Sequence, residues 1–113
     1  MSVSHVTTHI LDTSIGRPAP GVAVVLEARD GDGWVGIGTG LTDADGRVKE
    51  LGPERLESGA YRLRFDTGTY FAGIETDTFF PFVELTFEVK DTAEHYHVPL
   101  LISPFAYSTY RGS

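Results

Sequence analysis

The chain has 113 residues, of which 41% are hydrophobic and 22% are charged, and these are the proportions of a globular protein rather than of a disordered chain. Its net charge of −7 argues against binding to nucleic acid or to an anionic membrane surface, because the phosphates of both would repel it. The absence of cysteine excludes a disulfide framework and a thiolate metal site.

The length predicts a single domain over residues 1–113. Residues 1–11 contain no basic run followed by an apolar stretch, so no signal peptide is predicted. No apolar run is long enough to span a membrane. We therefore expect a soluble cytoplasmic protein.

In chain order the sequence reads as a succession of short strands separated by turn signals. The alternation is clearest where Tyr61, Leu63 and Phe65 alternate with charged residues, which is typical of a strand with one buried and one wet face. The predicted strands are 4–12, 22–30, 33–42, 47–51, 60–66, 82–90, 94–102 and 105–111. The spacing predicts an all-β fold, an antiparallel sandwich or barrel in which two sheets have four strands each.

Two connections have a more specific pattern. Asp45 and Gly46 form a tight-turn pair directly before Arg47. Asp66 or Thr67 is predicted to cap one short helix, because these residue types are favoured at helix N-termini.

All four histidines of the chain lie in two of the predicted strands. His5 and His9 share the parity opposite to the apolar side chains of the first strand, and His95 and His97 do the same in the seventh. The predicted core face of the seventh strand is formed by Tyr96, Val98, Leu100 and Ile102. If both strands belong to one sheet, His9 and His97 converge on one outward surface.

Three interpretations of this histidine surface remain open from the residues alone. The side chains can simply be solvated. A metal site needs three or four protein ligands, and the spacing supplies no third one, so no metal ligand is predicted. A catalytic site is the third interpretation, because two imidazoles and a guanidinium can activate water and stabilise an oxyanion without any cofactor.

The end of the sequence is unusually apolar. Apolar side chains run from Leu100 almost to the last residue, whereas most domains finish in a few mobile polar residues. We expect that packing of this segment holds the hydroxyl and carboxylate groups of Ser113 in place.

Four segments in order resemble the 5-hydroxyisourate hydrolase family, the enzyme branch of the transthyretin-like proteins. They are Thr8–Thr13 with Gly16–Ala19, Thr42–Arg47, His95–Leu101 and Ser103–Ser113. The resemblance covers essentially the whole chain. It implies a transthyretin-like sandwich of two four-stranded sheets with one short helix, and a homotetramer, built as a dimer of dimers, with its sites where the two dimers meet.

The resemblance also implies an activity and a set of residues. The activity is hydrolysis of 5-hydroxyisourate to 2-oxo-4-hydroxy-4-carboxy-5-ureidoimidazoline in urate degradation, with no cofactor. The residues that match the catalytic positions of the family are His9, Arg47 and His97. Those expected to contact the substrate are Ser108, Tyr110, Arg111 and Ser113.

Two competing functions are considered. A non-catalytic transthyretin-like carrier would bind a small ligand in the same channel, but that branch has lysine, glutamate and threonine where this chain has His9, Arg47 and His97. A plain β-sandwich interaction module would be a monomer that tolerates residues added after Ser113. The hydrolase interpretation predicts that such an extension damages activity.

Overall fold

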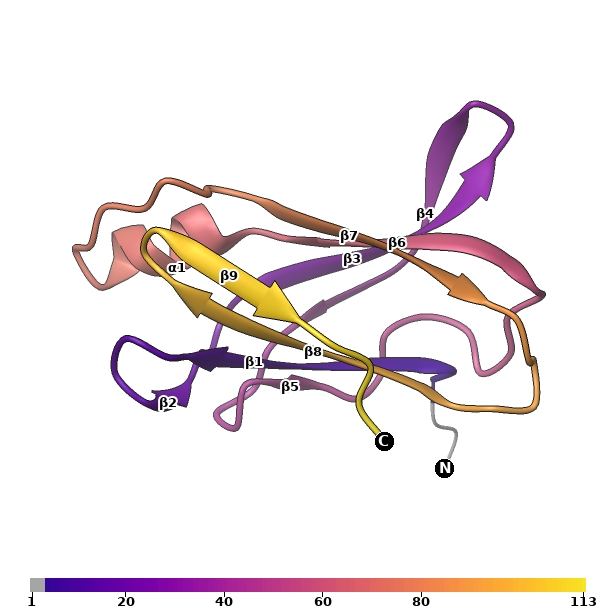
Figure 1. The fold of residues 1–113 in the computed structure, drawn as a ribbon, viewed down its shortest axis with the longest axis horizontal. Coiled ribbons are helices and arrows are strands. Elements are labelled where there is room, and N and C mark those ends of the chain that lie inside the picture. Colours follow the sequence, from indigo (N-terminus) through magenta and orange to yellow (C-terminus); the bar gives the residue numbers. More distant parts are fainter. Residues whose placement is uncertain (1–3) are drawn as a thin grey trace.

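The structure is a computed structural model and describes residues 4–113. Two β-sheets face each other as layers, and one short helix lies at the end of the sandwich (Figure 1). The first sheet consists of β5 (Arg47–Val48), β2 (Arg17–Pro18), β1 (Val6–Asp12), β8 (Tyr96–Ser103) and β9 (Ala106–Thr109). The second sheet has the order β4 (Gly33–Leu41), β3 (Ala23–Asp30), β6 (Gly59–Phe65) and β7 (Val83–Val89).

The all-β sandwich is confirmed, but the first sheet has five strands instead of the predicted four. The additional strand is β2, whose two residues pair with Leu11 and Asp12. β5 pairs with the preceding part of β1, at Thr8 and His9. Since β8 occupies the whole of the other edge of β1, β2 and β5 share one edge and lie one after the other along it.

The expectation of a purely antiparallel fold was wrong at the centre of the first sheet, where β1 and β8 run parallel. Their register runs from Val6 opposite Tyr96 to Asp12 opposite Ile102. The physical reason is that no hairpin joins these strands. The whole second sheet lies between them in the sequence, and a long crossover of this kind permits a parallel pair.

The core lies between the two layers and follows the predicted parity. In β8 the side chains of one parity are buried, at 8% exposure or less. The largest fully buried side chains come from both sheets and the helix, and include Ile10, Leu26, Leu63, Phe65, Phe71 and Leu100. Burial of each such side chain stabilises the fold by about 1.5–3 kcal/mol before the loss of conformational entropy is subtracted.

The predicted helix is present as α1 (Thr67–Gly73). Asp66 is its N-cap, and its Oδ1 accepts a hydrogen bond of 3.1 Å from the amide of Thr69. The helix packs onto the sandwich through Tyr70 and Phe71. The Tyr70 hydroxyl donates to buried Asp12 at the end of β1 over 2.7 Å. Burial raises the pKa of Tyr70, and the hydrogen bond to Asp12 and the charge of Asp12 raise it further.

His5 does not lie on the outward face with His9, so that prediction was wrong. Its side chain is 5% exposed. Its Nδ1 accepts a hydrogen bond of 2.7 Å from the amide of Leu56, and Nε2 donates to the carbonyl of Glu94 over 2.6 Å. The reason is that His5 precedes β1, so the alternation of the strand does not govern its direction.

Candidate active site

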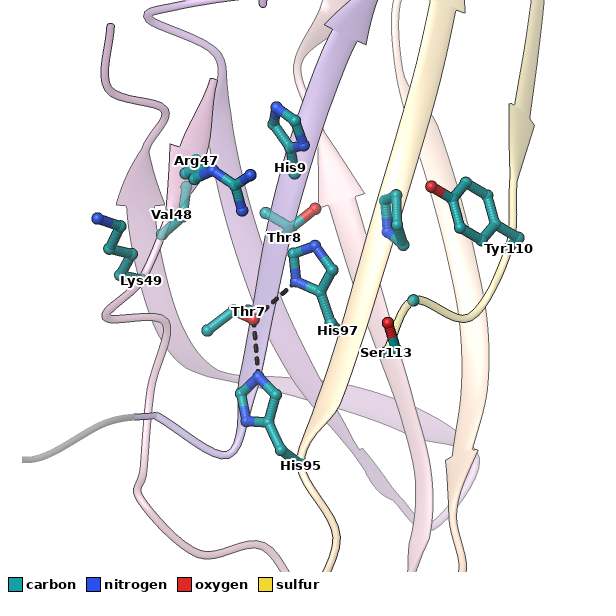
Figure 2. A pocket seen from close by; sticks show the side chains of 12 residues that line it. Thr7, Thr8, His9, Arg47, Val48, Lys49, His95, His97, Tyr110 and Ser113 are labelled. Atoms are coloured by element: carbon teal, nitrogen blue, oxygen red, sulfur yellow. Dashed lines mark hydrogen bonds between the residues drawn. The ribbon is translucent and has the colours of Figure 1, made fainter. Parts of the chain in front are cut away.

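A hollow of about 460 Å³ lies on the outer surface of the first sheet. We call it the histidine hollow (Figure 2). Side chains from β1, β5, β8 and the C-terminal segment converge on it. Its lining residues are Thr7, Thr8, His9, Arg47, Val48, Lys49, His95, His97, Pro99, Tyr110, Gly112 and Ser113.

The parallel pairing of β1 and β8 brings the two outward histidines to the same hollow. Thr7 is opposite His97, and His9 is opposite Pro99, so both imidazoles belong to the outward parity of adjacent strands. His9 and His97 are each half-buried. Sequence reasoning left their convergence conditional on a shared sheet, and the structure satisfies that condition.

Arg47 joins them from the other edge of β1, where it is paired with His9. Arg47 follows a tight turn in which Gly46 has a φ of 74°. A Cβ added to Gly46 would lie 2.4 Å from the carbonyl oxygen of Ile10. Only glycine fits there. The Oδ1 of Asp43 accepts hydrogen bonds from the amides of Asp45 (2.9 Å) and Arg47 (3.0 Å).

The turn therefore fixes the backbone from which the guanidinium extends. The hydrogen bond from the Arg47 amide is the main cause that lowers the pKa of Asp43. Within residues 4–113, no carboxylate forms an ion pair with Arg47. Its guanidinium side chain points into the hollow toward His9 and His97 (Figure 2).

The C-terminal segment closes the opposite side of the hollow. The amide of Gly112 donates a hydrogen bond of 2.8 Å to the carbonyl of His97. A Cβ on Gly112 would lie 2.6 Å from Cδ2 of the His97 ring and 3.2 Å from Cγ of Pro99. The segment thus packs directly on the catalytic candidate, and only a glycine permits this approach. Tyr110 and Ser113, from the same segment, also line the hollow.

The surroundings of His97 keep its imidazole neutral. Burial lowers the pKa of His97 below its ordinary value of 6.5, and the positive charges of Arg47 and of the neighbouring histidines lower it further. Burial and the charge of His5 likewise lower the pKa of His95. A neutral imidazole with a lone pair available is the form that a general base requires near neutral pH.

Thr7 is a lining residue that sequence reasoning missed. Its Oγ1 lies 2.8 Å from Nδ1 of His97 and 2.8 Å from Nε2 of His95. The only signal in the sequence was its outward parity between His5 and His9. Its partners could be found only once the register of β1 against β8 was known.

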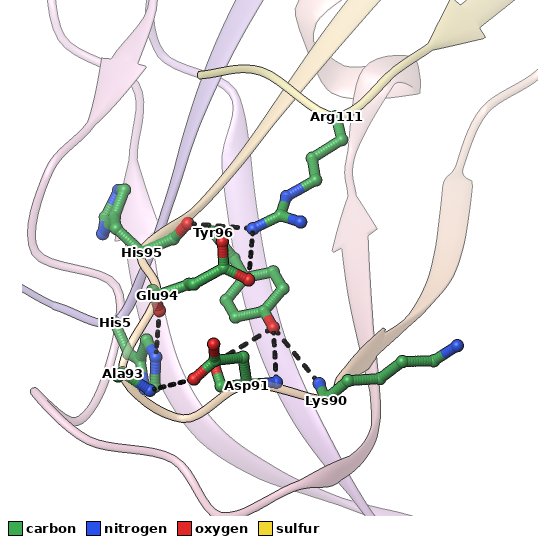
Figure 3. Close-up of polar contacts among 8 residues, drawn as sticks. All are labelled: His5, Lys90, Asp91, Ala93, Glu94, His95, Tyr96 and Arg111. Carbon is green, nitrogen blue, oxygen red and sulfur yellow. Dashed lines mark hydrogen bonds and ion pairs between the residues drawn. The ribbon is translucent and has the colours of Figure 1, made fainter.

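Arg111 and Ser108, which were expected to contact substrate, do not line the histidine hollow. The Arg111 guanidinium lies 4.4 Å above the ring of Tyr96 and 3.7 Å from Glu94, and it reaches the carbonyl of His95 at 3.4 Å (Figure 3). Ser108 is exposed in β9, opposite Leu101. Arg111 therefore clamps the segment that carries His95.

Among residues 4–113, no three histidine, aspartate or glutamate side chains gather in a way that could hold a metal ion. The chemical groups of the hollow are three imidazoles, one guanidinium, the ammonium group of Lys49 and several hydroxyl groups. That set can bind an anionic or carbonyl oxygen, accept a proton from water and return it.

Within residues 4–113, no helix has the length and apolar character needed to cross a membrane.

The comparisons with known proteins agree on one family. The model of the HIUase/Transthyretin family matches residues 6–112. A 5-hydroxyisourate hydrolase of Salmonella dublin is 53% identical over 108 residues, which cover 95% of this chain and 79% of that protein. The chain therefore belongs to the HIUase/transthyretin family.

Two solved structures show that the fold serves both branches of that family. The 5-hydroxyisourate hydrolase of Klebsiella pneumoniae has a TM-score of 0.83 and 38% identity, over 99% of this chain and 100% of that chain. Transthyretin from Sparus aurata has a TM-score of 0.88 and 34% identity, over 95% of each chain. Since the backbone fits both, the side chains of the hollow have to distinguish them.

Proposed function

We propose that this protein hydrolyses 5-hydroxyisourate to 2-oxo-4-hydroxy-4-carboxy-5-ureidoimidazoline in urate degradation. The observation that carries the proposal is the meeting of His9, Arg47 and His97 around one hollow, in a chain with a 53% identical relative named 5-hydroxyisourate hydrolase. The protein is then a cyclic amide hydrolase that acts without a cofactor.

In the proposed reaction a neutral imidazole, His97 or His9, accepts a proton from water. The water oxygen bonds to the ring carbonyl carbon, the carbon–nitrogen bond of the ring breaks, and the proton passes to the leaving ring nitrogen. Arg47 stabilises the negative charge that develops on the carbonyl oxygen, because a fixed cation is most effective where charge appears in the transition state. General acid–base assistance of this kind contributes about 10²–10⁴-fold.

Substrate contacts are proposed for Tyr110 and Ser113, which line the hollow beside His97. Ser113 is well placed to orient the substrate or the attacking water, because the Gly112–His97 hydrogen bond holds the backbone just before it. The proposal assigns no substrate contact to Ser108 or Arg111 within one chain.

A homotetramer, assembled as a dimer of dimers, is part of the proposal, with the histidine hollow facing the dimer–dimer interface. Exposed apolar side chains elsewhere on this sheet support assembly, since Phe105 at the β8–β9 turn is 68% exposed and Tyr107 in β9 is 40% exposed in the single chain. Light scattering after size-exclusion chromatography measures the assembly directly. A monomer would refute this part of the proposal. A cytoplasmic location is proposed with it.

A transthyretin-like carrier is the alternative function, and the fold alone is compatible with it. The chemistry of the hollow favours the hydrolase. His9 and His97 supply two proton acceptors and Arg47 supplies a cation, whereas a carrier of an apolar ligand needs neither proton acceptors nor a cation. Binding of small aromatic ligands without turnover of 5-hydroxyisourate would reverse this preference.

The test is an ultraviolet time course in which urate oxidase generates 5-hydroxyisourate from urate and the purified chain is then added. Decay faster than the spontaneous rate is expected. His97→Asn should lower kcat by about 10²–10⁴-fold while the circular dichroism spectrum and the assembly stay unchanged. Decay at the spontaneous rate with folded wild-type protein would contradict the hydrolase function, and near wild-type turnover of the variant would remove His97 from the mechanism.

A further inference from the structure

A chain of hydrogen bonds joins His97 through Thr7 to His95, which lines the histidine hollow and is also exposed to solvent. The hydroxyl oxygen of Thr7 lies 2.8 Å from a ring nitrogen on each side. His97 is half-buried, whereas His95 is exposed. Figure 2 shows Thr7 between the two rings, joined to each by a dashed line, with the second nitrogen of His97 on the side of Arg47 and His9.

The hydroxyl group limits which protons the two rings carry. A threonine hydroxyl has one proton to donate and lone pairs to accept. It can therefore donate to only one of the two imidazoles, and the other ring has to present an N–H to it. The protonated nitrogen of one histidine is thus coupled to that of the other through Thr7.

Arg47 determines the direction of this chain. Its guanidinium lies on the side of the hollow toward which the second nitrogen of His97 points. A positive charge there favours a lone pair on Nε2 over an N–H group. The proton of neutral His97 is then on Nδ1, which donates to Thr7, and the Thr7 hydroxyl donates to Nε2 of His95.

We propose that Thr7 is a positioning residue that holds His97 in the tautomer with a free Nε2 lone pair, and that His95 is the proton-accepting end of a path from the hollow to solvent. This inference rests on the proposed hydrolase function for its kinetic consequences only. It assigns roles to two residues that are not among His9, Arg47 and His97.

The proton steps balance. When Nε2 of His97 takes a proton from the attacking water, its Nδ1 proton moves to Thr7 Oγ1 and the original Thr7 proton moves to Nε2 of His95. His97 is then neutral with its proton on Nε2, and His95 carries the positive charge. When Nε2 gives its proton to the leaving ring nitrogen, both other protons move back and the starting arrangement returns.

The surroundings of His95 are built to hold this geometry. The residue before it is fixed by the hydrogen bond of 2.6 Å between His5 and the Glu94 carbonyl. The residue after it, Tyr96, is buried under the Arg111 guanidinium, and Arg111 also reaches the His95 carbonyl (Figure 3). An exposed histidine on a segment restrained on both sides loses little further conformational entropy when it bonds to Thr7.

The first experiment reads the tautomer without any substrate. Nitrogen-15 NMR of the full-length protein, labelled in histidine, distinguishes a ring nitrogen that carries a proton from one that carries a lone pair. Neutral His97 is expected to have its proton on Nδ1 in the wild type, and Thr7→Val is expected to give a mixture of tautomers. Finding the proton on Nε2 in the wild type, or an unchanged tautomer in Thr7→Val, would overturn the inference. These results do not depend on whether the protein hydrolyses 5-hydroxyisourate.

The second experiment is kinetic. Thr7→Val replaces a hydroxyl with a methyl group at nearly constant volume, and kcat is expected to fall about tenfold or more with little change in KM, since the general-base contribution is about 10²–10⁴-fold. Thr7→Ser, which restores the hydroxyl, should recover most of the rate. Thr13→Val is the matched control, because Thr13 also makes a hydroxyl hydrogen bond to β8, to the carbonyl of Ile102 at 3.0 Å, but does not line the hollow.

The variant His95→Gln distinguishes the two proposed roles, namely proton uptake by His95 and control of the His97 tautomer by Thr7. The amide oxygen still accepts a hydrogen bond from Thr7 but cannot take up a proton. The tautomer of His97 should therefore persist while turnover slows at low buffer concentration and recovers when imidazole is added. Wild-type turnover with wild-type buffer dependence would remove His95 from the path.

Discussion

Arg62 on the outer face of the second sheet and Arg47 on the outer face of the first sheet differ in whether an ion-pair partner neutralises their charge. On the second sheet, the Nε of Arg62 lies 2.8 Å from Glu27 and the guanidinium lies 4.7 Å above the ring of Trp34. On the first sheet, Arg47 has no ion-pair partner among the described residues 4–113. The charge of Arg62 is neutralised within the fold and serves structure, whereas the charge of Arg47 is available to a bound molecule.

His5 and His97 show a similar difference in the hydrogen-bond partners of their ring nitrogens. Both ring nitrogens of His5 are bonded to backbone groups, which fixes its tautomer and ties β1 to two loops. In His97, Nδ1 is bonded to Thr7 while the other nitrogen faces the hollow. The same residue type is structural where both nitrogens are satisfied and chemically available where one is left open.

The largest expected effect compares the two arginines directly. Arg47→Gln should lower kcat by about 10²–10³-fold, which is the cost of losing one group that stabilises an oxyanion, with little change in stability. Arg62→Gln should lower the free energy of unfolding by up to about 1 kcal/mol and leave kcat unchanged. Kinetics and urea unfolding of both variants measure this. Loss of turnover in a folded Arg62→Gln variant would contradict the assignment of a purely structural role to Arg62.

A smaller effect is expected from the contact between the C-terminal segment and His97. Gly112→Ala places a methyl group 2.6 Å from the His97 ring if nothing moves, so ring and segment must shift. A displacement of about 1 Å can cost about 10²-fold in rate, and we expect a loss of roughly tenfold or more in kcat/KM. Gly73→Ala is the control, because a Cβ there meets no atom within 4 Å. Equal activity of the two variants would show that His97 tolerates displacement.

The smallest effect is a pH dependence of stability. The groups facing His97 are Arg47 and Lys49 from the edge of the hollow and the imidazoles of His9 and His95. Burial, and then the charges of Arg47, His9 and His95, lower the pKa of His97 in the folded state below 6.5. The unfolded chain therefore takes up the proton first, and stability present above about pH 6.5 is lost as the pH falls toward the folded-state pKa.

Urea unfolding of the wild type and of His97→Asn on both sides of that pH measures the effect. The wild type should lose more free energy of unfolding on acidification than the variant does. The acid limb of kcat/KM in the wild type should have its midpoint below 6.5 for the same reason. A midpoint above this value would mean that the hollow favours the imidazolium form.

Local chemistry let the sequence determine much of this protein by itself. Alternation predicted the core side chains of β6 and β8, and Asp45 with Gly46 predicted the turn before Arg47. The cap of α1 was predicted at Asp66 or Thr67, and Asp66 is the N-cap. The family followed from four motifs in order and is confirmed by the match over residues 6–112. Each of these predictions depends on neighbours in the chain, where side-chain periodicity and backbone preference act directly.

Only the tertiary structure decided which distant residues meet. The parallel register of β1 and β8 places Thr7 beside His97, and buried His5 accepts a hydrogen bond from the amide of Leu56. Arg111 turns away to clamp Tyr96 although it belongs to the same terminal motif as Ser113. Contacts between segments far apart in the chain are set by the packing of the whole sandwich, which no local pattern encodes.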